Sequence, residues 1–525
     1  MKGFLYFFAL ISFTSAGNIL FLAPFNGPSH WLFLSNIIRE LLQKGHHLTA
    51  VTGIPLKGGN ENYTEILIDP PYDFNRKFSP DSVFDGHFVS PFVSVLMLYE
   101  LGIDNSEWGL QNEKVQKLIN SKSLKFDLVI SEQFFQETWL MFAHKFNAPL
   151  VTISTLGHTD YMDYANGLMT PLAYVPHVLV DFSDKMTFFE RCENVALTLF
   201  DRFYRLASYM PRNNELARKY FGNLEKENGY LPSVEDMERK IDLMLVNFNN
   251  ALSKPRPQMP NQINIGGAHI RKNPSPLPAD MQKFLDEAEH GVIYMSLGAF
   301  VQSSLMPEEK LREILSAFSQ LKQRVLWKFE AKLENIPKNV MINKWMPQAD
   351  ILAHKNIRLF ISHGGMFGTS EGTSNGVPML FIPFYGDQHR NAIKGEKAGT
   401  ALKIRFGDIT AESFLKKITT IIDNPKYRDN AKEIARVFND NVVHPMDTAI
   451  FYIEYVMRNK GAKYLKSGAV ELSWYQHFYL DILGFVCGIL FILGLILYGF
   501  VKFLVKIICG GAKKSKKSSV KTKKS

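Results

Sequence analysis

One continuous stretch, residues 345–388, decides the fold: WMPQADILAHKNIRLFISHGGMFGTSEGTSNGVPMLFIPFYGDQ. Residues 357–361 form a short apolar run with one charge, which is typical of a buried strand. A Ser-His-Gly-Gly turn follows, and the residues from Gly368 onward are expected to open a helix that Gly376 ends. Residues 377–384 then form a second apolar strand. The stretch predicts a strand–turn–helix–strand unit of an open α/β sheet.

The turn of this unit has the features of a phosphate site. In open α/β sheets, ligands bind outside the carboxyl ends of the strands, where the helix N-terminus presents free N–H groups and a positive dipole end. His363 lies at this turn, and Gly365 lets a ligand approach the backbone closely. Glu371 can accept hydrogen bonds from sugar hydroxyls, and Asp387 and Gln388 follow the next strand on the same rim. These groups suit a nucleotide that carries a diphosphate and a sugar.

A strand–Gly–Gly–helix turn is common by itself, so the residues around it decide the interpretation. The W-x-P-Q run at 345–348, the glutamate one helical turn after the glycines and the D-Q pair at 387–388 occur in this order. Together they resemble the donor-binding signature of the UDP-glycosyltransferases, the family that includes the UDP-glucuronosyltransferases. The resemblance implies donor contacts from these residues: Ser296, Trp345, Gln348, His363, Gly365, Glu371, Asp387 and Gln388.

The resemblance also implies a role for each of these residues. Trp345 would stack on the uracil, and Gln348 would contact the base or the ribose. Glu371 would bind the ribose hydroxyls, whereas the D-Q pair would bind the hydroxyls of the transferred sugar. Ser296, His363 and the backbone amides after it would hold the diphosphate.

Phe367 departs from the family pattern, because the family often has an asparagine at this place. One phosphate or hydroxyl contact is therefore expected to be missing or replaced by backbone. The resemblance associates this form of the motif with invertebrate members, which more often use UDP-glucose than UDP-glucuronate. It favours glucose as the sugar, with glucuronic acid next.

The mature chain opens with a second α/β unit. Residues 18–25 form an apolar strand, residues 30–44 have apolar positions at helical spacing, and residues 48–52 form another strand. His30 lies at the turn into the helix, on the edge of the sheet where ligands bind. In the resembled family the catalytic base is a histidine at this turn, in a G-x-H pattern that here reads G-P-S-H-W. His30 is accordingly the candidate base.

A carboxylate is expected to pair with this histidine. Residues 127–130 form a strand, and Glu132 stands directly after its end. The resembled family has a carboxylate near this place, usually aspartate. Glutamate is one methylene longer, so its reach to the imidazole is not given by the resemblance. Glu132 is the preferred partner of His30, and Glu137 is the alternative that the sequence leaves open.

The resemblance covers essentially the whole chain and implies an α/β fold of two doubly wound, Rossmann-like domains facing across a cleft (GT-B type). The N-terminal, acceptor-binding domain is expected over residues 18–252. A proline-rich linker follows over 253–280, where neither a helix nor an interior strand is expected. The C-terminal, UDP-sugar-binding domain is expected over 281–460, with closing helices that cross back onto the first domain. The aromatic segment 155–229 would wall an apolar acceptor pocket.

Both ends of the chain carry targeting signals. Residues 1–17 have the pattern of a secretory signal peptide. After a juxtamembrane segment at 461–480, residues 481–501 are apolar and long enough to form a transmembrane helix. Lysines follow at once in the tail 502–525, which places that tail in the cytosol. The sequence therefore predicts a single-pass type I membrane protein with lumenal catalytic domains, and the lysines near the C-terminus resemble a retrieval signal of the endoplasmic reticulum.

The basic charge of the chain lies in its tail. The net charge is +9, and nine lysines follow the last apolar segment: Lys502, Lys506, Lys513, Lys514, Lys516, Lys517, Lys521, Lys523 and Lys524. The rest of the chain is close to neutral, so a nucleic-acid surface is not expected. Cys192 is the only one of three cysteines before the apolar segment, which excludes a disulfide within the lumenal part. Asn62 begins an Asn-Tyr-Thr glycosylation sequence.

The expected reaction is an inverting transfer of a hexosyl group from a UDP-sugar to a hydroxyl of a small lipophilic acceptor such as a phenol, flavonoid or steroid. The UDP-sugar is a co-substrate, and no cofactor is expected. No metal is expected either, because helix amides and a histidine would carry the diphosphate charge and the chain has no Asp-x-Asp pair to hold one. A dinucleotide oxidoreductase is disfavoured because no G-x-G-x-x-G follows a strand. A non-catalytic type I membrane protein that binds lipophilic ligands on a degenerate scaffold is the alternative. The sequence leaves open whether the protein forms a homo-oligomer.

Overall fold

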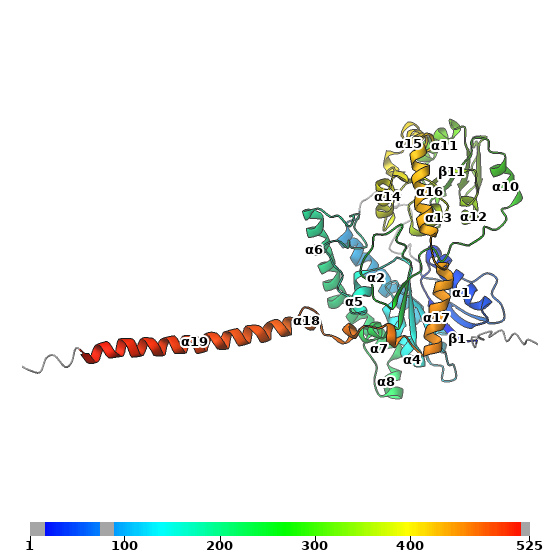
Figure 1. Cartoon of the computed structure of the whole chain (residues 1–525). Coiled ribbons are helices and arrows are strands. Elements are labelled where there is room, and N and C mark those ends of the chain that lie inside the picture. Colours follow the sequence, from blue (N-terminus) through cyan, green and yellow to red (C-terminus); the bar gives the residue numbers. More distant parts are fainter. Residues whose placement is uncertain (1–15, 74–83, 85–88, 516–525) are drawn as a thin grey trace, which may run out of the picture. The chain divides into compact units, whose positions relative to one another are not determined.

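A computed structural model describes residues 16–73, 84 and 89–515 (Figure 1). Most of the expected signal peptide and the end of the lysine tail lie outside these residues. The chain divides into two units, Met1–Lys466 and Ser467–Ser525. The first unit contains both sheets, and the second contains the long apolar helix.

Short apolar segments of the first half of the chain form a parallel sheet. Its strands are β1 (Asn18–Ala23), β2 (His47–Thr52), β3 (Tyr63–Leu67), β4 (Leu128–Glu132), β5 (Leu150–Ser154), β6 (Leu243–Val246) and β7 (Gln262–Asn264). They lie in the order β3-β2-β1-β4-β5-β6-β7, and every neighbouring pair is parallel. The order reverses between β1 and β4, which makes that point the topological switch where ligands of such sheets bind.

The second half repeats this topology. Its strands are β8 (Val292–Ser296), β9 (Arg324–Lys328), β10 (Val340–Asn343), β11 (Ile357–Ser362), β12 (Met379–Phe381) and β13 (Ala401–Lys403). Their order is β10-β9-β8-β11-β12-β13, again with parallel neighbours. The second switch point lies between β8 and β11. The expectation of two doubly wound sheets is confirmed.

Helices cover both faces of each sheet. In the first half they are α1 (Pro28–Gln43), α2 (Pro91–Leu110), α3 (Glu113–Ile119), α4 (Met141–Phe146), α5 (Asp160–Ala165), α6 (Phe188–Tyr204), α7 (Met210–Phe221), α8 (Asn223–Asn228) and α9 (Val234–Lys240). In the second half they are α10 (Ala279–Asp286), α11 (Glu308–Ser319), α12 (Gln348–Leu352), α13 (Met366–Ser374), α14 (Gln388–Lys397), α15 (Ala411–Asp423), α16 (Pro425–Asn439) and α17 (Pro445–Asn459). A π-helical turn, Arg205–Tyr209, joins α6 to α7.

The cores follow from the two-residue period of the strands. Leu20 and Leu22 of β1 point into one apolar core, whereas Ile19 and Phe21 point into another on the opposite face. The core on the second face is closed by α1 and by α17, which lie side by side in Figure 1. Helix α17 belongs to the last part of the chain and packs against α1 of the first half, while α16 stays against α13 and α15.

Several predicted boundaries move. Helix α13 begins at Met366 rather than Gly368, because extended Gly365 is its N-cap, and Glu371 therefore lies in its second turn. The strand expected over 377–384 shortens to β12, since prolines on both sides of it lack an N–H donor. Strand β7 lies inside the proline-rich segment 253–280, but at the edge of the sheet, where proline is tolerated.

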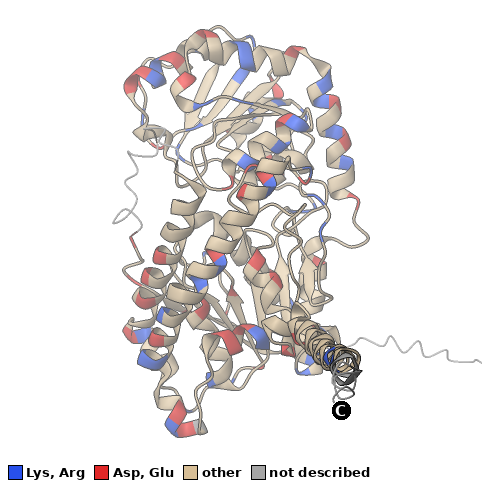
Figure 2. Ribbon diagram, turned by 90° about the vertical axis from the view of Figure 1, so that its left-hand side faces the viewer, with Lys and Arg blue, Asp and Glu red and all other residues tan. Residues whose placement is uncertain are grey.

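The second unit holds α18 (Trp474–His477) and α19 (Leu480–Ser515). Residues Leu480–Cys509 of α19 are long and apolar enough to cross a membrane, which fits the segment expected at 481–501. Over the first unit, acidic and basic residues alternate on the outer helices instead of gathering by sign (Figure 2). This distribution agrees with the near-neutral composition of that part of the chain.

Candidate active site

The first switch point holds a histidine–carboxylate pair. Pro28 starts α1 directly after the turn from β1, which places His30 in the first turn of the helix. Glu132 is the last residue of β4, the neighbour of β1 in the sheet. Nδ1 of His30 lies 2.5 Å from Oε1 of Glu132, and both side chains are buried. The extra methylene of glutamate therefore does not prevent the contact.

Thr155 completes this group and was not predicted from the sequence. Its Oγ1 lies 2.9 Å from Nδ1 of His30 and 3.2 Å from Oε1 of Glu132. The signal that could have found it is its position directly after β5, on the same edge of the sheet. Nδ1 is thus engaged twice, and among the described residues Nε2 has no hydrogen-bond partner. Because His30 lines a cleft, Nε2 is the nitrogen available to a ligand.

Two phenylalanines hold the imidazole in place. The ring centroid of His30 lies 4.8 Å from that of Phe25 and 4.4 Å from that of Phe134. Phe25 comes from the turn after β1 and Phe134 from the turn after β4. Such packing fixes the rotamer of the histidine in addition to its hydrogen bonds.

Glu137 belongs to a different cluster. Its Oε1 accepts a hydrogen bond from Nη1 of Arg205 at 3.1 Å, and its Oε2 accepts one from the hydroxyl of Tyr209. Arg205 also contacts Glu238. This buried network joins the π-helical turn to α9 and is separate from the contacts of His30. The structure therefore brings Glu132, and not Glu137, to the histidine.

The second switch point holds Ser296 and His363, which end β8 and follow β11. Burial lowers the pKa of His363 to about 4, and the charge of Lys328 adds to the effect, so its imidazole is neutral at pH 7. Two glycines surround the ring: a Cβ at Gly298 would lie 2.7 Å from Cε1, and one at Gly365 would lie 2.4 Å from Nε2. Side chains at these positions would displace the imidazole.

The N-terminus of α13 starts beside this histidine. The helix begins after Gly365 with no side-chain cap, so its first N–H groups are open to a ligand. Lys328 adds positive charge nearby, with Nζ 2.8 Å from the carbonyl oxygen of Gly298. Helix dipole, free amides and lysine together form a site suited to a diphosphate.

A buried hydrogen-bond network lies further along α13. Nε2 of Gln348 donates to Oε2 of Glu371 at 2.6 Å, and the hydroxyl of Tyr294 donates to Oε1 of Gln348 at 3.4 Å. Burial raises the pKa of Glu371 to about 7, although the hydrogen bond from Gln348 lowers it. Trp345 nearby is 66% exposed, so its ring is open to stacking by a planar base.

Asp387 and Gln388 stand at the start of α14. Oε1 of Gln388 accepts hydrogen bonds from the backbone N–H of Phe384 at 2.8 Å and of Tyr385 at 3.2 Å. The carbonyl of this side chain therefore shapes the turn, and only its NH₂ group can reach a ligand. Asp387 accepts from Nδ2 of Asn391 at 2.8 Å and is partly exposed.

One cleft of about 1490 Å³ connects these groups. It is lined from both halves of the first unit, by His30 on one side and by all eight residues expected to contact the donor on the other. Glu132 lies behind His30 and does not line it. Asn62, the expected glycosylation site, lies away from the cleft in a turn before β3 and is partly exposed.

Phe367 connects the two halves of the first unit. Its ring lies 5.5 Å from that of Phe33 on α1 and 5.1 Å from that of His269. It packs against the core formed by α1 and α17. The residue that departs from the family pattern thus joins the helix that carries His30 to α13, whose N-terminus is suited to a diphosphate.

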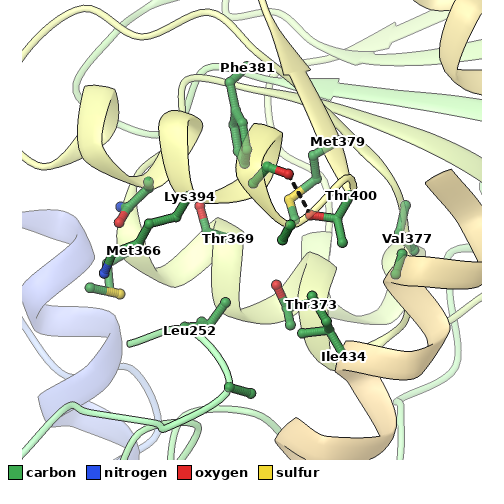
Figure 3. Close-up of a pocket in the computed structure, with 15 residues that line it drawn as sticks. Leu252, Met366, Thr369, Thr373, Val377, Met379, Phe381, Lys394, Thr400 and Ile434 are labelled. Carbon is green, nitrogen blue, oxygen red and sulfur yellow. Dashed lines mark hydrogen bonds between the residues drawn. The ribbon is translucent and has the colours of Figure 1, made fainter. Parts of the chain in front are cut away.

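A second, small cavity of about 50 Å³ lies behind α13 (Figure 3). Apolar side chains such as Met379 and Ile434 line it together with Lys394. Burial lowers the pKa of Lys394 to about 7, and the charge of Arg390 lowers it further. The cavity is far too small for a nucleotide. Among the described residues, no group of three or more His, Cys, Asp or Glu is placed to hold a metal ion.

Two doubly wound sheets with both switch points on one cleft define the GT-B glycosyltransferase architecture. Solved structures bear out the fold: the calicheamicin glycosyltransferase CalG4 matches with a TM-score of 0.55 at 17% identity, covering 85% of this chain and 99% of its own. The glycosyltransferase VinC in complex with DTDP matches with a TM-score of 0.55 at 15% identity, covering 84% of this chain and 100% of its own.

The chain belongs to the UDP-glucoronosyl and UDP-glucosyl transferase family, whose model matches residues 90–516. It is 36% identical over 515 residues to UDP-glycosyltransferase UGT5 of Dactylopius coccus, covering 96% of each chain. It is 30% identical over 514 residues to UDP-glucuronosyltransferase 2B13 of Oryctolagus cuniculus, covering 93% of each. The protein is accordingly an enzyme of the UDP-glycosyltransferase class.

Proposed function

We propose that the protein transfers a hexosyl group from a UDP-sugar to a hydroxyl of a small lipophilic acceptor, with inversion at the anomeric carbon. The observation that carries this proposal is the His30–Glu132 pair, which lines the same cleft as the N-terminus of α13. A base on one wall and an anion site on the other are the two groups that a single displacement needs.

The acceptor side of the reaction rests on His30. An acceptor hydroxyl is a poor nucleophile at neutral pH, so a base must remove its proton as its oxygen attacks the anomeric carbon. Nε2 of His30 accepts that proton. Glu132 holds Nδ1–H and stabilises the imidazolium that forms, with Thr155 fixing the same nitrogen.

The donor side rests on the second switch point. The bond from the anomeric carbon to the diphosphate oxygen breaks as the acceptor bond forms, and UDP leaves with the negative charge. The amides at the start of α13, Ser296 and neutral His363 stabilise that charge. Trp345 stacks on the uracil, Glu371 takes the ribose hydroxyls through the oxygen not held by Gln348, and the D-Q pair takes the sugar hydroxyls.

Glucose is the favoured sugar, and glucuronic acid comes next. Phe367 replaces the asparagine that the family often has, and a relative with 34% identity, covering 96% of this chain and 94% of its own, is named UDP-glucosyltransferase 2 of Dactylopius coccus. The rabbit relative named for glucuronic acid transfer is less similar. For the acceptor, the cleft wall is rich in aromatic and aliphatic side chains, which suits a phenol, flavonoid or steroid.

We further propose that the catalytic unit lies in the lumen of the endoplasmic reticulum and that α19 anchors it. The apolar helix and the glucuronosyltransferase relatives support a membrane anchor. A glycosidase-sensitive mass shift that disappears in Asn62→Gln tests the lumenal orientation. A chain that is unglycosylated and degraded by protease in sealed microsomes would contradict it.

The test of the function is an assay of UDP release in microsomes that contain the full chain. UDP-glucose and UDP-glucuronate are each combined with a panel of phenols, flavonoids and steroids. Release of UDP that depends on the acceptor and is faster with UDP-glucose supports the proposal. Folded protein that binds acceptors but releases no UDP with either donor would instead support the non-catalytic alternative.

A further inference from the structure

Helix α6 presents apolar side chains to the outside as well as to the core. Apolar residues recur on its outer side at spacings of three and four, and we call them the α6 apolar face: Phe188, Cys192, Val195, Leu199, Phe203 and, in the π-helical turn, Leu206. Phe188, Phe203 and Leu206 are 63, 69 and 72% exposed. A surface helix of a soluble domain normally presents polar residues to water, so this face calls for a partner.

Two polar residues of α6, Asn194 and Asp201, point inward and are hydrogen-bonded there. Asn194 is fully buried and donates from Nδ2 to the carbonyl oxygens of Leu172 and Val175. Asp201 accepts a hydrogen bond from the hydroxyl of Tyr99 at 2.6 Å. Turning the helix to bury its apolar face would break these buried hydrogen bonds. The face is therefore held outward by the fold.

Most charges of α6 lie at the flanks of the face and have partners, whereas the exposed Glu193 lines the cleft. Arg202 makes a bidentate contact with Asp160: Nε donates to Oδ2 at 2.7 Å and Nη2 donates to Oδ1 at 2.8 Å. Arg191 donates to the carbonyl oxygen of Met186, and Glu190 completes the N-terminal capping box. Arg191 and Arg202 lie at the border of the face, three or four residues from its members, and both guanidinium groups are engaged in these contacts. Such a surface suits a hydrocarbon boundary better than water.

The chain itself contains a segment that can place it at a membrane. Helix α19 is long and apolar enough to cross a bilayer. The first unit ends at Lys466, whose Nζ donates to the carbonyl oxygen of Arg239 in α9. Helix α9 packs against α7, which continues α6 through the π-helical turn. The segment 467–479 before α19 spans at most about 45 Å, so a bilayer crossed by α19 lies within that distance of Lys466.

We propose that the α6 apolar face docks on the lipid bilayer that α19 crosses, with α6 lying in the plane of the interface. Phenylalanine and leucine side chains on one face of a helix are the groups that enter this region of a membrane. The proposal concerns a surface outside the catalytic groups and does not depend on which sugar or acceptor the enzyme uses.

Cys192 allows a direct measurement, because it is exposed and lies on the α6 apolar face. The full chain with Cys487→Ser and Cys509→Ser carries a nitroxide spin label at Cys192 and is placed in phosphatidylcholine vesicles. Collision rates of the label with oxygen, which concentrates in lipid, and with a water-soluble nickel chelate are then measured. The control moves the label to Arg312→Cys on α11, a side chain that is 70% exposed, in a chain that also carries Cys192→Ser.

Docking predicts an oxygen-to-nickel ratio at Cys192 about fivefold or more above that at position 312, since the label lies in the interface. Adding Leu199→Glu and Phe203→Glu should bring the ratio down to the control value, with UDP-sugar binding retained as a sign of correct folding. A ratio at Cys192 equal to the control in the unaltered face would overturn the proposal. So would a label shielded from both probes that shows spin–spin broadening, because a second copy of the chain would then cover the face.

Discussion

Replacing Glu132 by glutamine isolates the charge of its pair with His30. The side chain of Glu132 is fully buried, and glutamine has nearly the same shape, so packing is preserved. Oε2 of Glu132 has no hydrogen-bond partner among the described residues. The NH₂ group of glutamine can take that place while the amide oxygen still accepts from Nδ1–H of His30. The geometry then stays, and the negative charge that stabilises the imidazolium is lost.

The size of the effect follows from the contact. A hydrogen bond to a charged group contributes about 1.5–3 kcal/mol, against about 0.5–1.5 kcal/mol for a neutral one. The difference of about 1–2 kcal/mol lowers kcat roughly 5- to 30-fold. If the amide instead donates to Nδ1, Nε2 carries the proton and cannot act as a base, and the loss reaches about 10⁴-fold as in a serine protease with the equivalent change. In both cases the Kd for the UDP-sugar is expected to stay within about twofold of the wild-type value, because interactions made equally in the ground state and the transition state are not altered.

The assay measures single-turnover transfer together with UDP-sugar binding by calorimetry. Glu137→Gln is the matched control, because Glu137 is also buried and hydrogen-bonded but contacts Arg205 instead of His30. Weakening a buried ion pair costs up to about 3–5 kcal/mol of folding free energy, so this variant should lose thermal stability and keep the kcat of its folded fraction. Wild-type kcat in Glu132→Gln, or an equal loss of kcat in both variants, would refute the assigned role.

Three further predictions concern residues in the second half of the chain. Burial raises the pKa of Glu371 to about 7, so ionisation of this carboxyl destabilises the folded state as pH rises from 4.5 through 7. Glu371→Gln removes the ionisable group. Between pH 5 and 8, wild type should therefore lose about 1–3 kcal/mol of folding free energy relative to the variant in thermal denaturation. Burial lowers the pKa of Lys394 to about 7, so the pH dependence of stability has the opposite sign: between pH 7 and 10.5 the unfolded state binds more protons than the folded state. The Tm of wild type should therefore rise relative to that of Lys394→Met across this range. Parallel plots of Tm against pH for the two proteins would contradict the burial of Lys394. Phe367→Ala should lower kcat about tenfold by loosening α1 against α13, with the Kd for the UDP-sugar unchanged. Phe367→Leu should keep most of the activity. Loss of UDP-sugar binding in both variants would mean that Phe367 shapes the donor site itself.

Much of the fold follows from local patterns. The strands at 18–25 and 357–361 appear within two residues of their predicted limits, because short apolar runs bounded by turn-forming residues have few alternatives. His30 and the residues predicted to bind the donor line one cleft, since parallel strands bring their carboxyl ends to one edge. A single sequence therefore shows which residues follow strand ends and so lie on that edge of the sheet.

Contacts between distant segments were harder to predict. Thr155 contacts His30 across the sheet, and an isolated threonine after a strand carries no distinctive pattern. Phe367 was recognised as unusual, but its packing on Phe33 depends on the return of α17 and the closeness of the two halves. Helix α6 was expected only as part of an aromatic segment, because it has apolar residues on both its inner and its outer side and the apolar period alone does not say which face is inside.

The central claim is that His30 is the base for a sugar transfer whose donor site lies on the other half of the first unit. The most direct test compares His30→Ala with wild type in two measurements on the same preparation, UDP-sugar affinity by calorimetry and product formation from UDP-glucose with a phenolic acceptor. The account predicts that product formation falls at least about 10²-fold while the Kd for UDP-glucose changes less than about twofold. Undiminished product formation, or loss of donor affinity together with activity, would contradict it.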